Sequence, residues 1–203
     1  PNPERDAQDR RRETVGAIPL QPGTGQSSDA VEPSWAFGSR SLGDGGGVRL
    51  GIGAVATKTH SLSASTKQQL AAVGLVSPDM HELAPGLESA QAYCRCIQAA
   101  KEANPFGAAV DVHPPEDYAH DRIFITEDGK AGIVLTPDGD RVSAFTYPGA
   151  STKGAMMTMF NLAAQQGGTT GDCFDTILPD YYSQVGARVV ARLDWNDEYA
   201  PEG

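Results

Sequence analysis

The chain has 203 residues, a net charge of -10 and 39% hydrophobic residues, which is typical of one globular domain. The acidic balance argues against a surface for nucleic acids or anionic membranes. No apolar run approaches the roughly 20 residues that span a bilayer, and no basic-then-apolar signal peptide opens the chain, so we expect a cytoplasmic protein with no membrane partner. The three cysteines show no C-x-x-C spacing, so no metal site is predicted.

Residues 1–47 are predicted to be a flexible N-terminal arm and linker. They are rich in Pro, Gly, Ser, Gln and Arg and lack apolar periodicity. The chain starts with Pro rather than Met, which indicates a processed product, a trimmed chain or a piece of a larger polypeptide. Residues 48–203 are predicted to form the folded domain.

The first half of this domain is predicted to hold one strand and two helices. Val48–Ala56 alternates with small residues, as a strand does. Helices are expected over Thr66–Val73, behind a serine N-cap, and over Glu88–Asn104, where apolar residues recur at helical spacing. His60 and His81 have no partner at ligand spacing, so we expect surface or locally bonded histidines.

From residue 108 the pattern becomes extended. Ala109–His113 alternates and predicts a strand. Two later Asp-Gly pairs, at Asp128 and Asp138, each lie between apolar runs and are the strongest short-range signal for a hairpin. The predicted product is an antiparallel meander of three strands: Arg122–Thr126, Ala131–Thr136 and Arg141–Tyr147.

A loop of small residues follows the meander and leads into a helix. Pro148–Ala155 is flexible, and the apolar stripe after it consists of Met156, Met159, Phe160 and Ala163. Unpaired backbone N–H groups at the start of a helix favour an anion such as a pyrophosphate. The loop is therefore a candidate anion-binding site.

The C-terminal part is predicted to contain a strand, a short helix and a last strand. The segment Asp180–Ala187 carries two adjacent tyrosines, Tyr181 and Tyr182, and a glycine at position 186. Arg188–Trp195 alternates and predicts the last strand.

This order of elements resembles the GNAT superfamily of N-acetyltransferases over about the last 150 residues. The family's loop motif is Gln/Arg-x-x-Gly-x-Gly/Ala, and its backbone amides bind the pyrophosphate of acetyl-CoA. Gly154 matches that motif, whereas Ser151 and Met156 differ from it, and Lys153 adds a positive charge. The resemblance implies an α+β fold with a mixed, mostly antiparallel sheet flanked by helices. The cofactor-binding residues it implies are Tyr147, Gly149, Ser151, Thr152, Lys153, Gly154, Ala155 and Met156.

The two tyrosines are similar in position to the family's Tyr-x-x-x-Gly-Phe segment, although Ala187 stands where Phe is usual. In many members that Tyr protonates the leaving CoA thiolate, which implies Tyr182 here, with Tyr181 as the alternative. A phenol with a pKa near 10 is protonated at neutral pH and can donate to a thiolate. Each tyrosine can equally be a residue at the edge of the core.

The implied reaction is acyl transfer from acetyl-CoA or another acyl-CoA to a small-molecule or protein amine. The amine must lose a proton, yet no base is singled out. The carboxylate candidates are Glu116, Asp117, Glu127 and Asp175, and His113 and His120 can also carry a proton.

A second hypothesis belongs to a different class of protein. The domain can be a GNAT-shaped module without catalysis, kept for interaction or structure in a larger polypeptide from a phage or toxin system. The departures from the loop motif favour this hypothesis, whereas Gly154 and Tyr182 favour the enzyme.

Overall fold

The structure is a computed structural model that describes residues 13–14, 40–41, 48–105, 107, 110–149, 152–175 and 178–194. The predicted arm, residues 1–47, lies outside the described residues except for two short strands, β1 (Glu13–Thr14) and β2 (Arg40–Ser41).

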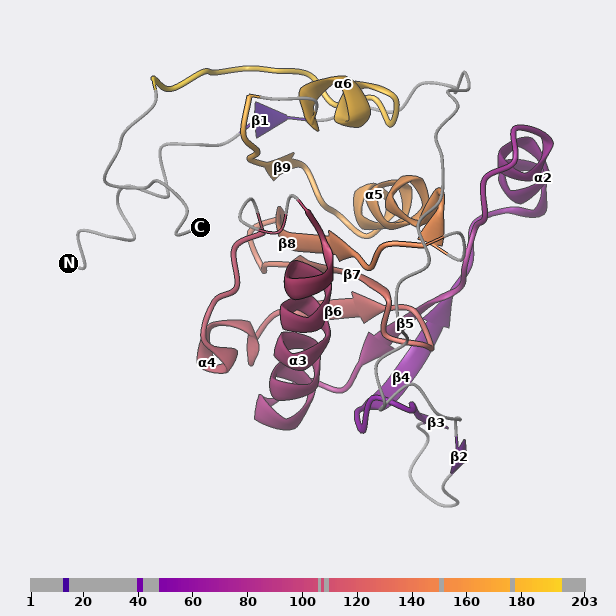
Figure 1. The fold of residues 1–203 in the computed structure, drawn as a ribbon, viewed down its shortest axis with the longest axis vertical. Coiled ribbons are helices and arrows are strands. Elements are labelled where there is room, and N and C mark those ends of the chain that lie inside the picture. The colour runs from indigo at the N-terminus through magenta and orange to yellow at the C-terminus, as the bar shows by residue number, and fades with distance from the viewer. Residues whose placement is uncertain are drawn as a thin grey trace.

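One sheet organises the fold (Figure 1). Its order is β1-β9-β8-β7-β6-β5-β4-β3-β2. Every neighbouring pair is antiparallel except β8 and β9, which are parallel. This confirms the predicted α+β class with a mixed, mostly antiparallel sheet. The remaining strands are β3 (Val48–Arg49), β4 (Val55–His60), β5 (Met80–Leu83), β6 (Arg122–Ile125), β7 (Ala131–Leu135), β8 (Asp140–Thr146) and β9 (Thr170–Gly171).

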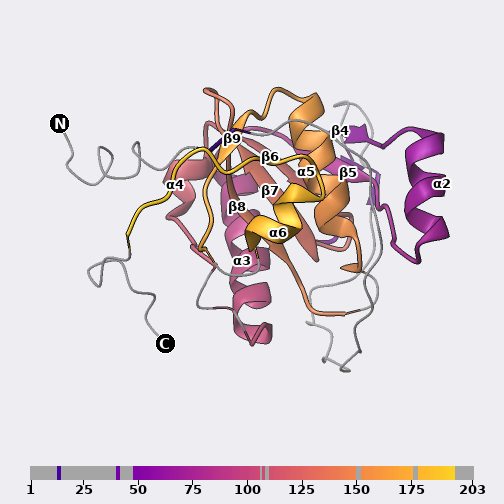
Figure 2. The same ribbon diagram turned by 90° about the horizontal axis from the view of Figure 1, so that it is seen from above.

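Five helices are described, and the two longest lie on opposite faces of the sheet (Figure 2). Strand β6 shows how the two faces are divided, because Ile123 and Ile125 pack in the α3 cluster and Phe124 packs in the α5 cluster. Each fully buried side chain of this kind contributes about 1.5–3 kcal/mol to stability. The helices are α2 (Ala64–Ala72), α3 (Leu87–Ala103), α4 (Pro115–Tyr118), α5 (Ala155–Gln165) and α6 (Leu178–Ser183).

The two predicted Asp-Gly turns are confirmed, and they share one construction. In the first turn the Thr126 hydroxyl donates to Asp128 at 2.7 Å, and Gly129 has a φ of 70°. In the second turn the Thr136 hydroxyl donates to Asp138, and the next residue is again a glycine with positive φ. A T-x-D-G sequence therefore sets the register of the β6–β7–β8 meander.

Four parts of the sequence-based prediction need correction. The predicted strand Val48–Ala56 is interrupted by a turn, in which the Gly53 N–H donates to the Leu50 carbonyl. Strand β5 was not predicted at all.

The predicted strand Ala109–His113 is wrong over its described residues, 110–113, which have no strand structure. The His113 N–H donates to the Tyr118 hydroxyl at 2.9 Å, and Pro114 and Pro115 then start α4. The His113 N–H is therefore bonded to a side chain and not to a neighbouring strand. Pro114 and Pro115 have no N–H group to donate to a strand partner.

The predicted last strand, Arg188–Trp195, is also wrong over its described residues, 188–194. The apolar side chains of this segment are exposed, Val190 to 55%, so their alternation reflects no buried face.

Candidate functional site

Strands β8 and β9 run parallel but separate almost at once. Their pairing consists of Asp140 with Thr170 and Arg141 with Gly171. Beyond Arg141, residues 142–146 of β8 have no described strand partner on the β9 side. A parallel pair needs a crossover connection, and α5 provides it. The candidate site is therefore the end of the short β8–β9 pair, beside the helix that connects the two strands.

A bulge in β8 lies directly after the last pair with β9. Ser143 has a φ of 50°, the one positive φ outside glycine among the described residues, and the β7–β8 register shifts at this point. Two buried tyrosines hold the bulge from the α3 side. The Tyr93 hydroxyl donates to the Ser143 carbonyl at 2.6 Å, and the Tyr118 and Ser143 hydroxyls lie 2.7 Å apart. Since a bulge bends its strand, it accounts for the separation of β8 from β9.

The loop after β8 is held by one of its own side chains. The Thr152 hydroxyl donates to the carbonyls of Tyr147 and Gly149, at 2.7 and 3.0 Å. Tyr147 is buried, and Gly149 has a φ of 146°. The predicted site residue Ser151 lies outside the described residues.

Helix α5 starts at this loop without a side-chain cap. Gly154 occupies the N-cap in a left-handed conformation with a φ of 97°, and it has no side chain to accept from the first-turn N–H groups. By contrast, the Ser63 side chain caps α2. Lys153 is exposed beside the cap. This end of α5 therefore combines amides that no side chain caps with a nearby positive charge.

One side of the loop is nevertheless covered by the segment after α2. The Val76 N–H donates to the Lys153 carbonyl at 2.8 Å, and a Cβ on Gly154 would lie 2.7 Å from the Leu75 Cβ. Ala155 is buried and Met156 partly buried in the α5 cluster. An anion therefore has access only from the sides that Leu75 and Val76 do not occupy.

The two tyrosines of α6 have different environments. The Tyr182 ring stacks on Phe160 of α5, with centroids 4.5 Å apart. Burial raises the pKa of Tyr182 above its ordinary value of 10.0, and the nearby Arg141 cation opposes the rise. Tyr181 is 45% exposed. The structure thus brings Tyr182, and not Tyr181, against α5 and the end of the β8–β9 pair.

Arg141 is a site residue that the sequence analysis missed. Its side chain is 5% exposed, its Nε donates to the Thr170 carbonyl at 3.0 Å, and its guanidinium lies over the Phe160 ring. Added Cβ atoms on Gly168 and Gly171 would lie 3.1 Å from its Cδ and its carbonyl oxygen. Gly168 and Gly171 are therefore the residues in the sequence that could have indicated a large residue packed at this place.

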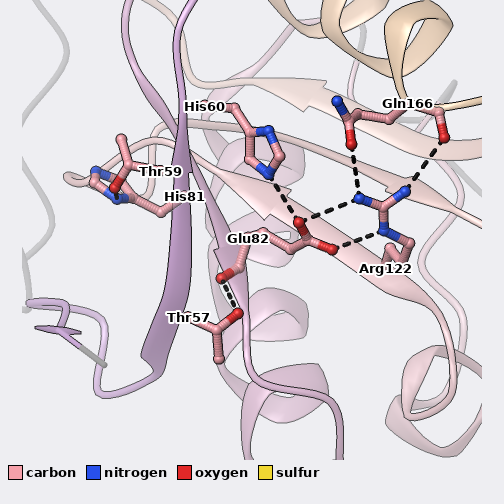
Figure 3. A network of polar contacts seen from close by, with 7 residues as sticks. All are labelled: Thr57, Thr59, His60, His81, Glu82, Arg122 and Gln166. Carbon is pink, nitrogen blue, oxygen red and sulfur yellow. Dashed lines mark hydrogen bonds and ion pairs between the residues drawn. The ribbon is translucent and has the colours of Figure 1, made fainter. Parts of the chain in front are cut away.

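A second polar cluster lies on the α5 face of β4, β5 and β6 (Figure 3). Glu82 accepts from Arg122 Nε at 2.7 Å and lies 2.7 Å from His60 Nε2, and Arg122 also donates to both oxygens of Gln166, just after α5. The hydrogen bond from Arg122 lowers the pKa of Glu82. Strand β7 lies between this cluster and β8. We therefore assign it to holding three strands and α5 together.

The carboxylate candidates for the base are all at the surface. Glu116 and Asp117 lie exposed on α4, Glu127 lies exposed in the β6–β7 turn, and Asp175 forms an ion pair with Arg192 at 2.8 Å. His113 lies 3.6 Å from Asp111, and His120 is exposed. The structure gives none of them a contact with Tyr182.

Comparison with known proteins adds no family: no protein-family model, curated protein or solved structure matches this chain. Within the described ranges, no helix is long and apolar enough to cross a membrane.

We expect the Glu82 cluster to make the stability of the protein sensitive to acid. Because the folded-state pKa of Glu82 lies below its ordinary value of 4.5, its contribution is present above that pH and is lost as the pH falls through the lowered value. Glu82→Gln should lower the unfolding free energy at pH 7 by about 1–3 kcal/mol. The variant should also lose less stability than wild type between about pH 6 and pH 3.

Urea denaturation at several pH values measures both effects. The matched control is Glu88→Gln, because Glu88 pairs with Arg49 while 71% of its side chain is exposed. An identical loss on acidification in wild type and Glu82→Gln would refute the assignment.

Proposed function

We propose that this protein is an acyl-CoA-dependent N-acyltransferase that transfers an acetyl or other acyl group to an amine. One observation carries the proposal: the parallel strands β8 and β9 separate after two residue pairs, and the free edge of β8 leads to an uncapped helix N-terminus. Coenzyme A combines a pyrophosphate with an extended arm that contains amides. A helix N-terminus suits the pyrophosphate, and a strand edge suits the amides.

In this proposal the loop residues divide the work of binding. The first-turn N–H groups of α5, following Gly154, donate to the pyrophosphate oxygens, and the exposed Lys153 adds a positive charge. Tyr147, Gly149 and Thr152 keep the loop in shape through the Thr152 hydroxyl. Ala155 and Met156 pack the start of the helix on the α5 cluster.

The chemistry proposed is direct transfer. The amine nitrogen, whose proton passes to solvent, attacks the thioester carbonyl and forms a tetrahedral oxyanion. When the carbonyl re-forms, the C–S bond breaks, and the sulfur leaves as a thiolate that takes a proton from Tyr182. Backbone N–H groups along the free edge of β8 stabilise the oxyanion.

Tyr182 is the proposed acid. Because burial keeps its phenol protonated, it is a hydrogen-bond donor to the thiolate throughout the neutral range. A raised pKa makes full proton transfer to sulfur less favourable. The guanidinium of Arg141 favours the phenolate and so reduces this cost.

A second candidate function rests on the covered side of the loop. The Val76–Lys153 hydrogen bond and the contact of Leu75 with Gly154 occupy space beside the α5 N-terminus. The Thr152 hydroxyl is already used within the loop. These contacts, with the departures from the GNAT motif, favour a GNAT-shaped module that serves interaction or structure within a larger polypeptide and has no catalysis.

Thermal unfolding with acetyl-CoA separates the two candidates. If the protein binds acetyl-CoA, a ligand concentration of about 100 times the dissociation constant raises the free energy of unfolding by about 2.7 kcal/mol. The melting temperature then rises by several degrees. Lys153→Glu should reduce this rise, because it reverses the exposed charge beside the loop. Lys58→Glu, at an exposed position in β4, is the matched control and should keep the full rise.

No rise with millimolar acetyl-CoA would favour the interaction module. An equal loss of the rise in Lys153→Glu and Lys58→Glu would place CoA elsewhere than at this loop.

Replacing each tyrosine of α6 tests the proposed acid. Tyr182→Phe keeps the ring that stacks on Phe160 and removes only the hydroxyl, so turnover should fall about 100-fold with little change in acetyl-CoA affinity. Tyr181→Phe changes an exposed ring and should keep the wild-type rate. Steady-state kinetics with a panel of amines measures both. If turnover falls in Tyr181→Phe instead, that residue is the acid.

A further inference from the structure

We propose that the guanidinium of Arg141 recognises a carboxylate group of the substrate, at the closed end of the β8–β9 separation. This names a substrate class for the acyltransferase and in that respect rests on the proposed function. The carboxylate comes either from an acyl chain that ends in a carboxylate or from an amine acceptor such as an amino acid.

The first support is an unsatisfied donor. Arg141 is only 5% exposed, and its Nη1 atom is buried with no hydrogen-bond partner. Its Nε is the guanidinium atom for which the structure gives a hydrogen bond, to Thr170. Leaving a charged donor buried and unpaired costs more than leaving a neutral donor so. A ligand oxygen at Nη1 would remove that cost.

The second support is that the surroundings are built to hold the guanidinium there. Gly168 leaves room for the Arg141 side chain, and Gly171 leaves room for the Arg141 carbonyl. The guanidinium lies 5.4 Å from the centroid of the Phe160 ring. Tyr182 stacks on the same ring. A group bound by Arg141 therefore lies close to the phenol proposed as acid.

The charges near Arg141 favour a carboxylate over a phosphate. Asp140 precedes Arg141 in β8, and its Oδ1 atom is likewise buried with no hydrogen-bond partner. The negative charge of Asp140 reduces the positive electrostatic potential around the Arg141 guanidinium. A monoanion with two coplanar oxygens matches a guanidinium under these conditions better than a phosphate dianion does.

The decisive experiment uses free carboxylates without coenzyme A. Isothermal titration of wild type with succinate and with its neutral isostere succinamide tests the acyl-chain source, and alanine against alaninamide tests the amino-acid source. In at least one pair the carboxylate should bind about tenfold or more tighter than the amide. If neither carboxylate binds tighter than its amide, the proposal is overturned, even if acetyl-CoA binds.

Variants of Arg141 then assign the preference. Arg141→Met keeps an apolar stem against Phe160 and removes the unpaired charge, so it should fold and lose the carboxylate preference. Arg141→Gln should lose it as well. A preference retained in either folded variant would overturn the proposal. If both variants fail to fold, the comparison of carboxylates with amides in the wild-type protein tests the proposal by itself.

The proposed function can fail separately. Carboxylate binding lost in Arg141→Met, together with no acetyl-CoA binding in wild type, would leave the carboxylate site standing and remove only the acyltransferase. With both present, succinyl-CoA binding tighter than acetyl-CoA identifies the acyl chain as the source.

Discussion

The hydrogen bonds that Tyr93 and Tyr118 form with Ser143 hold strand β8 in its bent course. Buried phenol hydroxyls need partners, and the bulge at Ser143 offers a carbonyl to one tyrosine and a hydroxyl to the other. The bend follows directly after the last residue that pairs with β9. The packing of the α3 layer thus determines where the strand edge opens on the far side of β8, and the other site features are placed relative to that edge.

Helix α5 connects the parts of the candidate site. Its first turn is the uncapped end beside the loop, and Phe160, five residues after Ala155 and so about 8 Å along the axis, contacts both Arg141 and Tyr182. Both ends are fixed by contacts outside the helix. Val76 holds the residue before Gly154, and Arg122 holds Gln166. The spacing between the uncapped first turn and the phenol of Tyr182 is therefore set by a helix that contacts hold at both ends.

Local chemistry made much of this fold predictable. The T-x-D-G turns and the helical spacing in α3 and α5 follow from short-range interactions, so the meander and both main helices could be predicted. Strand β5 could not, because its sequence Met-His-Glu-Leu has two polar residues, one of which, Glu82, is paired across the sheet. For Arg188–Trp195 a strand was predicted where none forms over residues 188–194, because alternation alone does not provide a partner strand.

The candidate site was predictable only where its residues are neighbours in sequence. Gly154 and Tyr182 belong to short motifs, and their positions by the start of α5 and on α6 follow from those motifs. The burial of Arg141 depends on glycines about 30 residues later and on a ring from α5, and the bend of β8 depends on tyrosines from α3 and α4. Contacts between such distant segments leave no periodic signal.

Amide hydrogen exchange with and without acetyl-CoA tests the central claim most directly, because the claim concerns particular backbone N–H groups. We expect added protection at residues 155–157 of α5 and along residues 142–146 of β8, with no change in α2. Protection that is unchanged in both segments at a saturating concentration of acetyl-CoA would contradict the account.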